Sequence, residues 1–206
     1  MQDLKNQLRK LLGEKARPIL FLAGLGGSGK TTVADEIAKQ SETDSIVLHF
    51  DWWLRYPTEA RKKRIQQALA SNDPEAIEAE ENPKNWYDWE KMKADLLHLQ
   101  DTGQTVLIDA WDQQTGLKNL KVPLELPESG LIICEGIYLL HPDITEVTDC
   151  IVFLDVSKDV CRKRAEARDG HRSSPEYLAY KAALVEKYDV PYFEEYKKNA
   201  DIVIKR

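Results

Sequence analysis

The sequence predicts an α/β fold, the three-layer α/β/α arrangement of P-loop NTPases, with a mainly parallel sheet and a helical lid. Two observations carry this prediction. Short, wholly apolar runs alternate with helical patterns along the chain, and the first of these runs leads into a glycine-rich loop. Continuous apolar runs are typical of strands buried on both faces of a parallel sheet. Their alternation with helices indicates a doubly wound sheet.

The composition limits what such a fold can be. The chain has 206 residues, of which 42% are hydrophobic and 31% are charged, and its net charge is −6. This length suits one domain with its own core, so we expect a single P-loop domain over residues 1–206. A negative net charge argues against a general nucleic-acid-binding protein. The apolar runs are too short to span a membrane, and the N-terminus lacks a signal-peptide pattern. We therefore expect a cytoplasmic protein without nucleic-acid or membrane partners.

Each element is predicted from its own pattern. Leucines at positions 4, 8, 11 and 12 recur at helical spacing and predict an N-terminal helix within residues 1–17, which Pro18 ends. The apolar run 19–23 predicts the first strand, and 31–40 the helix after the glycine loop. Further strands are expected at 45–50, 105–110, 131–134, 150–155 and 201–204. Further helices are expected at 58–71, 74–81, 88–101, 157–169, 174–188 and 191–198. The segment 122–130, rich in Pro and Glu, is interpreted as a surface loop.

Cysteines and histidines give no sign of a metal site or of a disulfide framework. The three cysteines, Cys134, Cys150 and Cys161, are odd in number, and two of them lie in or beside apolar runs. We interpret them as small core residues of a cytosolic protein. The four histidines have no metal-ligand spacing, and the sequence assigns them no role.

The glycine-rich loop is the most specific motif in the chain. The run Gly24-Leu25-Gly26-Gly27-Ser28-Gly29-Lys30-Thr31 matches G-x-x-x-x-G-K-[ST], and it lies between an apolar strand and a helix that continues with Thr32. Glycines allow backbone amides to approach phosphate oxygens, and the N-terminus of the following helix favours negative charge. Lys30 is predicted to reach the β- and γ-phosphates, and the Thr31 hydroxyl to bind Mg²⁺. The loop therefore predicts a site for a nucleoside triphosphate.

The remaining motifs separate the classes of P-loop protein. An N-K-x-D motif, which a GTPase uses to read guanine, does not occur, and motor ATPases need a longer chain. Asp51 instead follows the second apolar run, at the edge of the sheet where ligands bind in open α/β folds. A carboxylate there can accept or orient the proton of an attacking hydroxyl; the alternative is an Asp that caps the next helix. Trp52, Trp53 and Tyr56 are candidate walls of a pocket for a flat base, or else core and loop anchors.

Glu135 follows the apolar run Leu131–Cys134 and is succeeded by Gly136. An acidic residue directly after a buried strand is the Walker-B arrangement, which holds the Mg²⁺ shell. The alternative is that Glu135 stands at the strand end by chance and has no role toward a metal. We assign Glu135 to the metal together with Thr31.

A basic helix late in the chain is a candidate lid. It carries Arg164 and Arg168 on one face, with Arg172 after Gly170, and Ser157 is a plausible N-cap. Such arginines can neutralise charge that develops during phosphoryl transfer, although basic helix faces are often only solvated. We assign Arg164 and Arg168 to catalysis and Arg172 to the substrate, with the break at Gly170 as a hinge.

The order of these features resembles the uridine kinase and phosphoribulokinase group of P-loop small-molecule kinases. That group also includes nicotinamide riboside kinases and bacterial pantothenate kinase. The resemblance runs from Pro18 to Ile204, and it is strongest at 131–140 (LIICEGIYLL) and at 196–204 (YKKNADIVI). It implies a single P-loop kinase domain over 1–206, with a lid at about 157–190.

The resemblance also implies site roles, position by position. Asp51 falls on the residue that activates the acceptor hydroxyl, and Lys30 and Thr31 on the phosphate and Mg²⁺ positions. The segment Asn85-Trp86-Tyr87-Asp88 is similar to the family's Asn-Phe/Trp-Asp, so Trp86 and Asp88 are implied to bind substrate, although the segment is one residue longer here. Asp109 falls in the family's Tyr-Asp-Phe segment, with Ile108 in place of Tyr. The departures therefore lie in the acceptor half of the site.

Together these features predict an ATP- and Mg²⁺-dependent kinase that phosphorylates a hydroxyl of a small metabolite. The acceptor that we expect first is a nucleoside. Pantothenate, nicotinamide riboside and a sugar phosphate are alternative acceptors. A sugar phosphate would need basic residues near Asp51, which the segment 55–64 offers. The alternative from another class is a module that senses nucleotide without chemistry; release of ADP that depends on an acceptor separates the two. The sequence leaves open whether the chain forms a homo-oligomer.

Overall fold

The structure is a computed structural model and describes residues 2–169 and 174–206. The chain forms two compact units, the first made of residues 1–49 and 126–206 and the second of residues 50–125. Each unit has its own sheet, and they are described separately below. The single P-loop kinase domain expected from the sequence stays a prediction.

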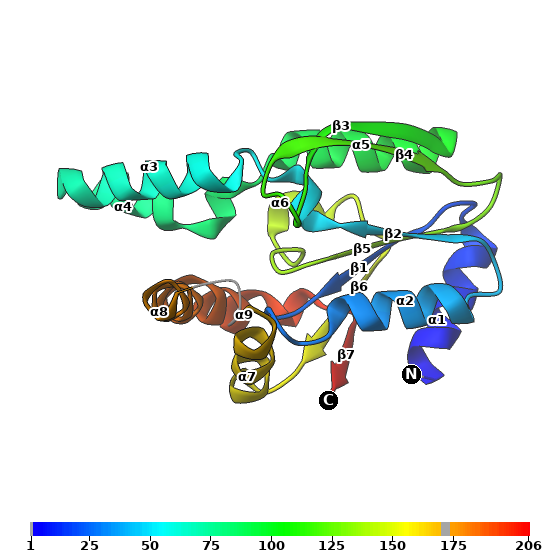
Figure 1. Ribbon diagram of the computed structural model, residues 1–206. Coiled ribbons are helices and arrows are strands. Elements are labelled where there is room, and N and C mark those ends of the chain that lie inside the picture. The colour runs from blue at the N-terminus through cyan, green and yellow to red at the C-terminus, as the bar shows by residue number, and fades with distance from the viewer. Residues whose placement is uncertain (1, 170–173) are drawn as a thin grey trace. The chain divides into compact units, whose positions relative to one another are not determined.

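The first unit is built on a parallel sheet of five strands in the order β2-β5-β1-β6-β7 (Figure 1). Four of its strands lie within a residue or two of their predicted positions and β5 runs two residues further, so the predicted fold class is confirmed. In chain order the strands are β1 (Ile19–Ala23), β2 (Ser45–His49), β5 (Leu131–Gly136), β6 (Cys150–Asp155) and β7 (Ile202–Lys205). Strands β1 and β5 are buried at every position, as parallel strands covered on both faces must be.

Helices cover both faces of this sheet. Leu4, Leu8 and Leu11 of α1 (Gln2–Glu14) and Val33 and Ile37 of α2 (Lys30–Gln40) join one hydrophobic cluster with alternate residues of β1, β5 and β6. The opposite face meets α9 (Val190–Tyr196), where the ring of Phe193 lies 5.2 Å from that of Phe153 in β6. Figure 1 shows α1 and α2 together on one side of the sheet.

The rest of the first unit follows β5 and β6. It consists of α6 (Pro142–Thr145), α7 (Lys158–Asp169), α8 (Pro175–Leu184), a π-helical turn η3 (Val185–Asp189) and a 3₁₀ turn η4 (Lys197–Asn199). The helix expected over 174–188 is therefore interrupted, because its last turn widens into the π form. All three cysteines are buried and free, as expected. Among the described residues, no helix is long and apolar enough to cross a membrane.

The second unit packs helices against a two-stranded antiparallel sheet. It comprises η1 (Phe50–Trp53), α3 (Thr58–Ser71), α4 (Pro74–Glu81), η2 (Pro83–Trp86), α5 (Trp89–Thr102), β3 (Gln104–Trp111) and β4 (Lys118–Glu125). Met92, Leu96 and Leu99 on one face of α5 are fully buried, and α5 contacts β3, where Leu107 is also buried. Asp73 and Asp88 cap α4 and α5 with their side chains.

Two predictions fail in the second unit. The strand expected at 105–110 exists, but within the described part of the chain it pairs with β4 alone and does not join the parallel sheet. The segment 122–130, expected to be a loop, supplies the last four residues of β4. The reason is that β4 is half exposed: its residues alternate between intermediate and exposed positions, so it tolerates the Pro and Glu residues that suggested a loop.

Candidate functional site

The glycine-rich loop connects β1 to α2, as predicted. Gly27 and Gly29 have φ angles of 84° and 89°, in the left-handed region that favours glycine, and the Ser28 amide donates to the Leu25 carbonyl at 3.0 Å. A Cβ atom on Gly27 would lie 2.3 Å from the backbone oxygen of Cys161 in α7, so this loop packs directly on that helix. Around a Cβ on Gly29, by contrast, no atom lies within 4 Å. The loop is thus closed against α7 at Gly27 and open at Gly29.

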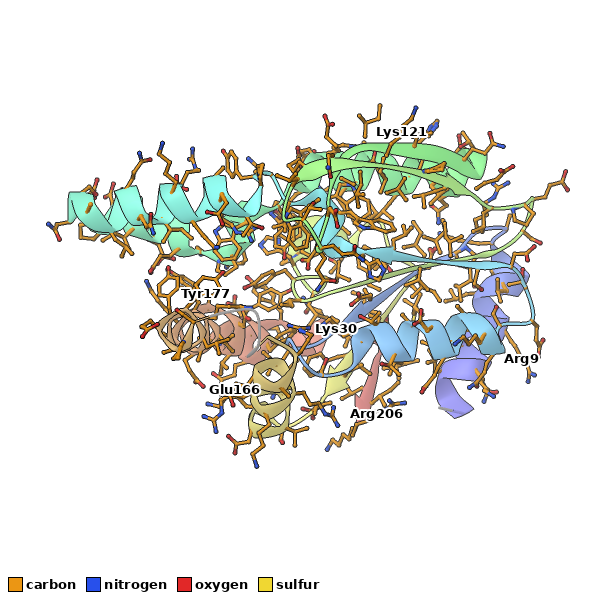
Figure 2. The ribbon with its side chains drawn as sticks, in the orientation of Figure 1. Arg9, Lys30, Lys121, Glu166, Tyr177 and Arg206 are labelled. Carbon is orange, nitrogen blue, oxygen red and sulfur yellow. The ribbon has the colours of Figure 1, made fainter. Side chains whose placement is uncertain are left out.

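Two polar side chains of the loop are buried. Ser28 is 1% exposed, and among the described residues its hydroxyl is one of two buried polar groups that lack a hydrogen-bond partner. Lys30 is 8% exposed, and its Nζ donates to the carbonyl oxygens of Gly24 at 2.9 Å and of Leu25 at 3.0 Å. Figure 2 shows Lys30 at the N-terminal end of α2. The ammonium is therefore held over its own loop by two neutral acceptors.

A second group of side chains lies beside the loop at the carboxyl ends of β2 and β5. The register pairs β2 with β5 so that His49 stands opposite Glu135, and it pairs Leu22 of β1 with Glu135 on the other side. Glu135 Oε1 accepts from the Thr31 hydroxyl at 3.1 Å and lies 2.8 Å from His49 Nδ1. The structure thus brings Thr31 and Glu135 together, as the sequence predicts for a metal-binding pair.

Opposing effects act on the Glu135 carboxyl. Its burial works to raise the pKa, but the hydrogen bond with His49 and the charge of Lys30 work against it, and the pKa lies below its ordinary value of 4.5. Glu135 is therefore ionised at neutral pH. A buried, ionised carboxylate beside a hydroxyl is a suitable environment for a divalent cation.

These residues fit the ATP and Mg²⁺ that the P-loop implies. The left-handed glycines, the unpartnered Ser28 hydroxyl and the start of α2 provide amide and hydroxyl donors for phosphate. Thr31 and Glu135 offer the oxygen ligands that Mg²⁺ prefers, few enough for the ion to retain water. Thr32 is exposed in the first turn of α2. The roles of these residues toward nucleotide and metal stay predictions.

The predicted lid helix is α7. Arg164 and Arg168 lie on it four residues apart, and both side chains are exposed. Since the backbone of α7 contacts Gly27, this helix is anchored to the phosphate loop. Arg172 and the hinge proposed at Gly170 lie outside the described residues. Catalysis by Arg164 and Arg168 stays a prediction.

In the second unit, Asp51 lies in η1 with its side chain exposed. Its Oδ1 accepts a hydrogen bond from the Tyr87 hydroxyl at 2.9 Å. Tyr87 is placed by Phe50, whose ring stacks on it at 3.9 Å, and by a β-bridge between Tyr87 and Leu54. The segment around Asp51 is therefore joined to the segment 86–88, and the residue that holds the Asp51 carboxylate, Tyr87, belongs to the same unit.

The aromatic residues assigned to the substrate have different surroundings. Trp53 is 3% exposed and its Nε1 donates to Asp95 at 2.7 Å, so it offers little surface to a ligand. Tyr56 and Trp86 are partly exposed, and arginines lie over both rings: Arg64 at 4.6 Å from Tyr56 and Arg61 at 4.8 Å from Trp86. Of the three, Tyr56 and Trp86 retain exposed surface for a substrate.

Asp88 and Asp109 lie on different elements, but the charges of both act on the pKa of one lysine, Lys118. Asp88 caps α5, accepting from the Lys91 amide at 3.2 Å. Asp109 has a φ of 55° at a bulge in β3 and is exposed. Burial lowers the pKa of Lys118 in β4, whereas Asp88 and Asp109 act to raise it, and its Nζ donates to the Leu54 carbonyl at 2.7 Å. Lys118 thus links the segments that carry Asp51, Asp88 and Asp109.

Sequence reasoning missed three residues of this arrangement: His49, Tyr87 and Lys118. His49 was given no role because it has no metal-ligand spacing, yet the parallel register places it beside Glu135. Knowing that β2 and β5 are neighbours would have revealed the pair, since His49 ends β2 and Glu135 is the last residue but one of β5. Tyr87 lies inside a segment that the sequence did single out. Lys118 had no sequence signal.

Comparisons with known proteins agree with this architecture. The family model of the NB-ARC domain matches residues 1–134, which contain the phosphate loop but end before Glu135. A uridine kinase of Ureaplasma parvum is 25% identical over 200 residues, spanning 94% of this chain and 90% of the relative. A solved structure of a possible uridine kinase from Bacillus stearothermophilus aligns with a TM-score of 0.60 at 19% identity, covering 98% of this chain and 99% of that one. Phosphoribulokinase from Rhodobacter spheroides aligns with a TM-score of 0.66 at 14% identity, covering 92% of this chain and 70% of that one.

The chain therefore belongs, through residues 1–134, to the NB-ARC family. Over nearly its whole length it is similar to uridine kinases, and it shares its fold with phosphoribulokinase. It is an ATP-dependent kinase of a small molecule. The NB-ARC match spans the phosphate loop, the second unit and the first four residues of β5, whereas the uridine kinase relative also spans Glu135 and the basic helix α7.

Proposed function

We propose that this kinase transfers the γ-phosphate of ATP to a hydroxyl of a small, uncharged metabolite, and that the acceptor is a nucleoside. Asp51 carries the proposal, because it is an exposed carboxylate held by the Tyr87 hydroxyl at 2.9 Å. With one oxygen fixed in this way, the carboxylate can accept or orient the proton of an attacking hydroxyl.

The donor half of the proposed site uses the residues of the first unit. The amides of the loop and the Lys30 ammonium bind the triphosphate, and Lys30 exchanges its bonds to the Gly24 and Leu25 carbonyls for bonds to phosphate oxygens. Thr31 and Glu135 hold Mg²⁺, which neutralises charge on the phosphates when it is bound. Arg164 and Arg168 on α7 exclude water, which would otherwise compete as the acceptor.

The covalent chain links the two halves of the proposed site. His49, which ends β2 and contacts Glu135, is only two residues before Asp51. Two residues span at most about 7 Å between Cα atoms. The carboxylate proposed to act on the acceptor is thus only two residues along the chain from the end of β2, where His49 contacts Glu135.

The charges near Asp51 favour an uncharged acceptor over an anionic one. Three carboxylates, Asp51, Asp88 and Asp109, belong to segments that Lys118 joins, and the Lys118 ammonium already has an acceptor in the Leu54 carbonyl. Most of the basic residues that a sugar phosphate would need have polar partners: Arg64 pairs with Glu80, Lys62 with Glu59, and Arg55 donates to the Tyr87 carbonyl. Arg61 lies over Trp86, and its buried Nη1 lacks a hydrogen-bond partner among the described residues. A carboxylate or phosphate on the acceptor would be repelled here.

A variant of Asp51 tests the role that the proposal gives it. We expect Asp51→Asn to bind ATP as the parent does but to lose about 10²- to 10⁴-fold in kcat, the usual contribution of a general base. Asp73→Asn is the matched control, because Asp73 is another exposed aspartate of the same unit whose capping role asparagine performs equally well. Near-normal turnover of Asp51→Asn would remove Asp51 from the mechanism.

An acceptor screen tests the substrate class. ADP release is measured with uridine, cytidine, nicotinamide riboside, pantothenate and a pentose phosphate, each at saturating Mg²⁺ and ATP. We expect kcat/KM to be highest for an uncharged nucleoside, with the cationic riboside tolerated and both anionic acceptors disfavoured. Preference for an anionic acceptor would contradict the charge argument while leaving the kinase assignment intact.

A further inference from the structure

The end of strand β2 carries a histidine to which the proposed function assigns no role. His49 is the last residue of β2 and the register partner of Glu135 in β5. Its Nδ1 lies 2.8 Å from Glu135 Oε1, which is a hydrogen-bond distance. Because an ionised carboxylate can only accept hydrogen bonds, the Nδ1–H group of the imidazole is the donor. A histidine thus holds one of the two residues that are assigned to Mg²⁺.

The periodicity of the two strands places both side chains on the face of the sheet that α2 covers. Successive side chains of a strand point to opposite faces, so Glu135 shares a face with Leu131 and Ile133, and His49 shares a face with Val47. Leu131 and Ile133 belong to the hydrophobic cluster that contains the buried residues of α2, and Val47 packs against it. The pair therefore continues the packed core of this face to the carboxyl end of the sheet.

Glu135 Oε1 accepts hydrogen bonds from two elements. The Thr31 hydroxyl of α2 donates to it at 3.1 Å, and the imidazole of His49 donates to it at 2.8 Å. The two donors differ in what a cation asks of them. The hydroxyl oxygen of Thr31 is itself assigned to the cation, whereas the Nδ1–H group of His49 has no lone pair to offer one. The bond from His49 therefore holds the carboxylate without competing with metal binding.

A fixed carboxylate matters more to Mg²⁺ than to larger cations. A glutamate side chain has several rotatable bonds, and ordering it at the moment of binding opposes the binding of the ion. A hydrogen bond that already exists in the folded chain removes part of that opposition. Mg²⁺ demands nearly ideal octahedral geometry, whereas Ca²⁺ accepts flexible arrangements of its ligands. A carboxylate held by the sheet should therefore favour the smaller ion.

We propose that His49 is a positioning residue for the metal site: by holding the Glu135 carboxylate in one orientation, it strengthens the binding of the cation that accompanies the nucleotide and favours Mg²⁺ over Ca²⁺. This inference rests on the assignment of Thr31 and Glu135 to Mg²⁺ in the proposed function. Loss of a group that orients a metal ligand typically lowers metal affinity about 10- to 100-fold. The affinity for Ca²⁺ falls less, because Ca²⁺ depends less on the orientation of one carboxylate.

The experiment is isothermal titration of the full chain with the non-hydrolysable ATP analogue AMPPNP, in Mg²⁺, in Ca²⁺ and without metal in EDTA. The dissociation constant without metal, divided by that with metal, measures the coupling between cation and nucleotide. In His49→Ala we expect this ratio to fall about 10-fold for Mg²⁺ and by less for Ca²⁺. The affinity without metal should stay close to the parent's. A purely structural role of His49 would instead weaken binding under all three conditions together.

A second substitution tests the hydrogen bond itself. In His49→Asn, the amide Nδ2 is as many bonds from the backbone as the histidine Nδ1, so it can donate to Glu135 and should restore the Mg²⁺ ratio toward the parent's. The side chain of His49 is 40% exposed, so its truncation should leave the fold intact. If His49→Ala nevertheless fails to fold, His49→Leu removes the donor and keeps the bulk. His98→Ala is the matched control, because His98 is an exposed histidine of α5, and its ratios should equal the parent's.

Glu135→Gln separates this proposal from the one on which it rests. An unchanged Mg²⁺ ratio in Glu135→Gln would contradict the metal assignment, and the role of His49 would fall with it. A reduced ratio in Glu135→Gln together with an unchanged ratio in His49→Ala would overturn the positioning role alone. Equal losses for Mg²⁺ and Ca²⁺ in His49→Ala, or a His49→Asn variant that binds Mg²⁺ no better than His49→Ala, would also overturn it.

Discussion

Three glycines of the phosphate loop, Gly26, Gly27 and Gly29, allow the packing of that loop on α7 to be tested by single substitutions. In Gly27→Ala, the new Cβ would lie 2.3 Å from the backbone oxygen of Cys161 and at a φ of 84°. An ordinary contact is more than 1 Å longer, and the obstructing atom belongs to a helix backbone and cannot rotate away. Left-handed backbone costs a non-glycine residue about 1–2 kcal/mol, and overpacking adds about 1–3 kcal/mol. We therefore expect a loss of about 2–5 kcal/mol in the free energy of unfolding.

The neighbouring glycines separate the two contributions. Gly29 has a φ of 89° but open space, so Gly29→Ala should lose only the backbone part, about 1–2 kcal/mol. Gly26 has neither a left-handed φ nor an atom within 4 Å, so Gly26→Ala should be neutral or stabilising by up to about 1 kcal/mol. Urea unfolding, read as a shift of midpoint at constant slope, gives all three values. If Gly27→Ala lost no more than Gly29→Ala, the direct contact between loop and α7 would be refuted.

Three further predictions concern single residues. Glu135→Gln should raise the Mg²⁺ concentration needed for half-maximal ADP release by about 10-fold or more, as loss of a metal-site carboxylate typically does; an unchanged Mg²⁺ requirement would contradict the metal assignment. Burial raises the pKa of Asp189 from 3.8 to about 6 in the folded chain, so its stabilising contribution is full below pH 3.8 and is lost as pH rises through 6. At pH 8, the free energy of unfolding of Asp189→Asn, measured with urea, should therefore exceed that of the parent by up to about 3 kcal/mol. Below pH 4 the two proteins should have the same free energy of unfolding. Trp53→Phe removes the donor to Asp95 and should lose about 1.5–3 kcal/mol of stability with the acceptor KM unchanged; a raised KM would place Trp53 in the acceptor pocket.

The donor half of the site was predictable from the sequence because its signals are local. The motif Gly24–Thr31 specifies the loop by adjacent residues, and the apolar run before it is buried at every position, so strand and loop are recognisable without knowing the rest of the fold. Glu135 was predictable for the same reason, since it directly follows the apolar run 131–134 in the sequence. The partner of Glu135, His49, could not be predicted from neighbouring residues, because the two are brought together by the pairing of β2 with β5.

The second unit was less predictable because its strands are only half buried. The run Val106-Leu107-Ile108 suggests a strand covered on both faces, yet Val106 and Ile108 are 43% and 60% exposed. Apolar side chains on an exposed face carry no information about which strand will be the partner. Likewise, the left-handed backbone of Asp109 arises from the bulge between Leu107 and Ala110, which depends on pairing with β4. The helices at 58–71 and 74–81 were nevertheless predicted to the residue, because Pro and Asp mark their starts.

The order of strands in the parallel sheet has a consequence for synthesis of the chain. Strand β5 lies between β2 and β1, although some eighty residues separate it from β2 in sequence. On the ribosome, β1, β2 and the phosphate loop emerge without the strand that pairs them, whereas the second unit is contiguous and can fold as it appears. Closing so long a loop is slow and entropically costly. Translation therefore reaches residue 136 before β1 and β2 can pair with β5. In a nascent chain halted earlier, the second unit could be folded while β1, β2 and the phosphate loop still lacked β5.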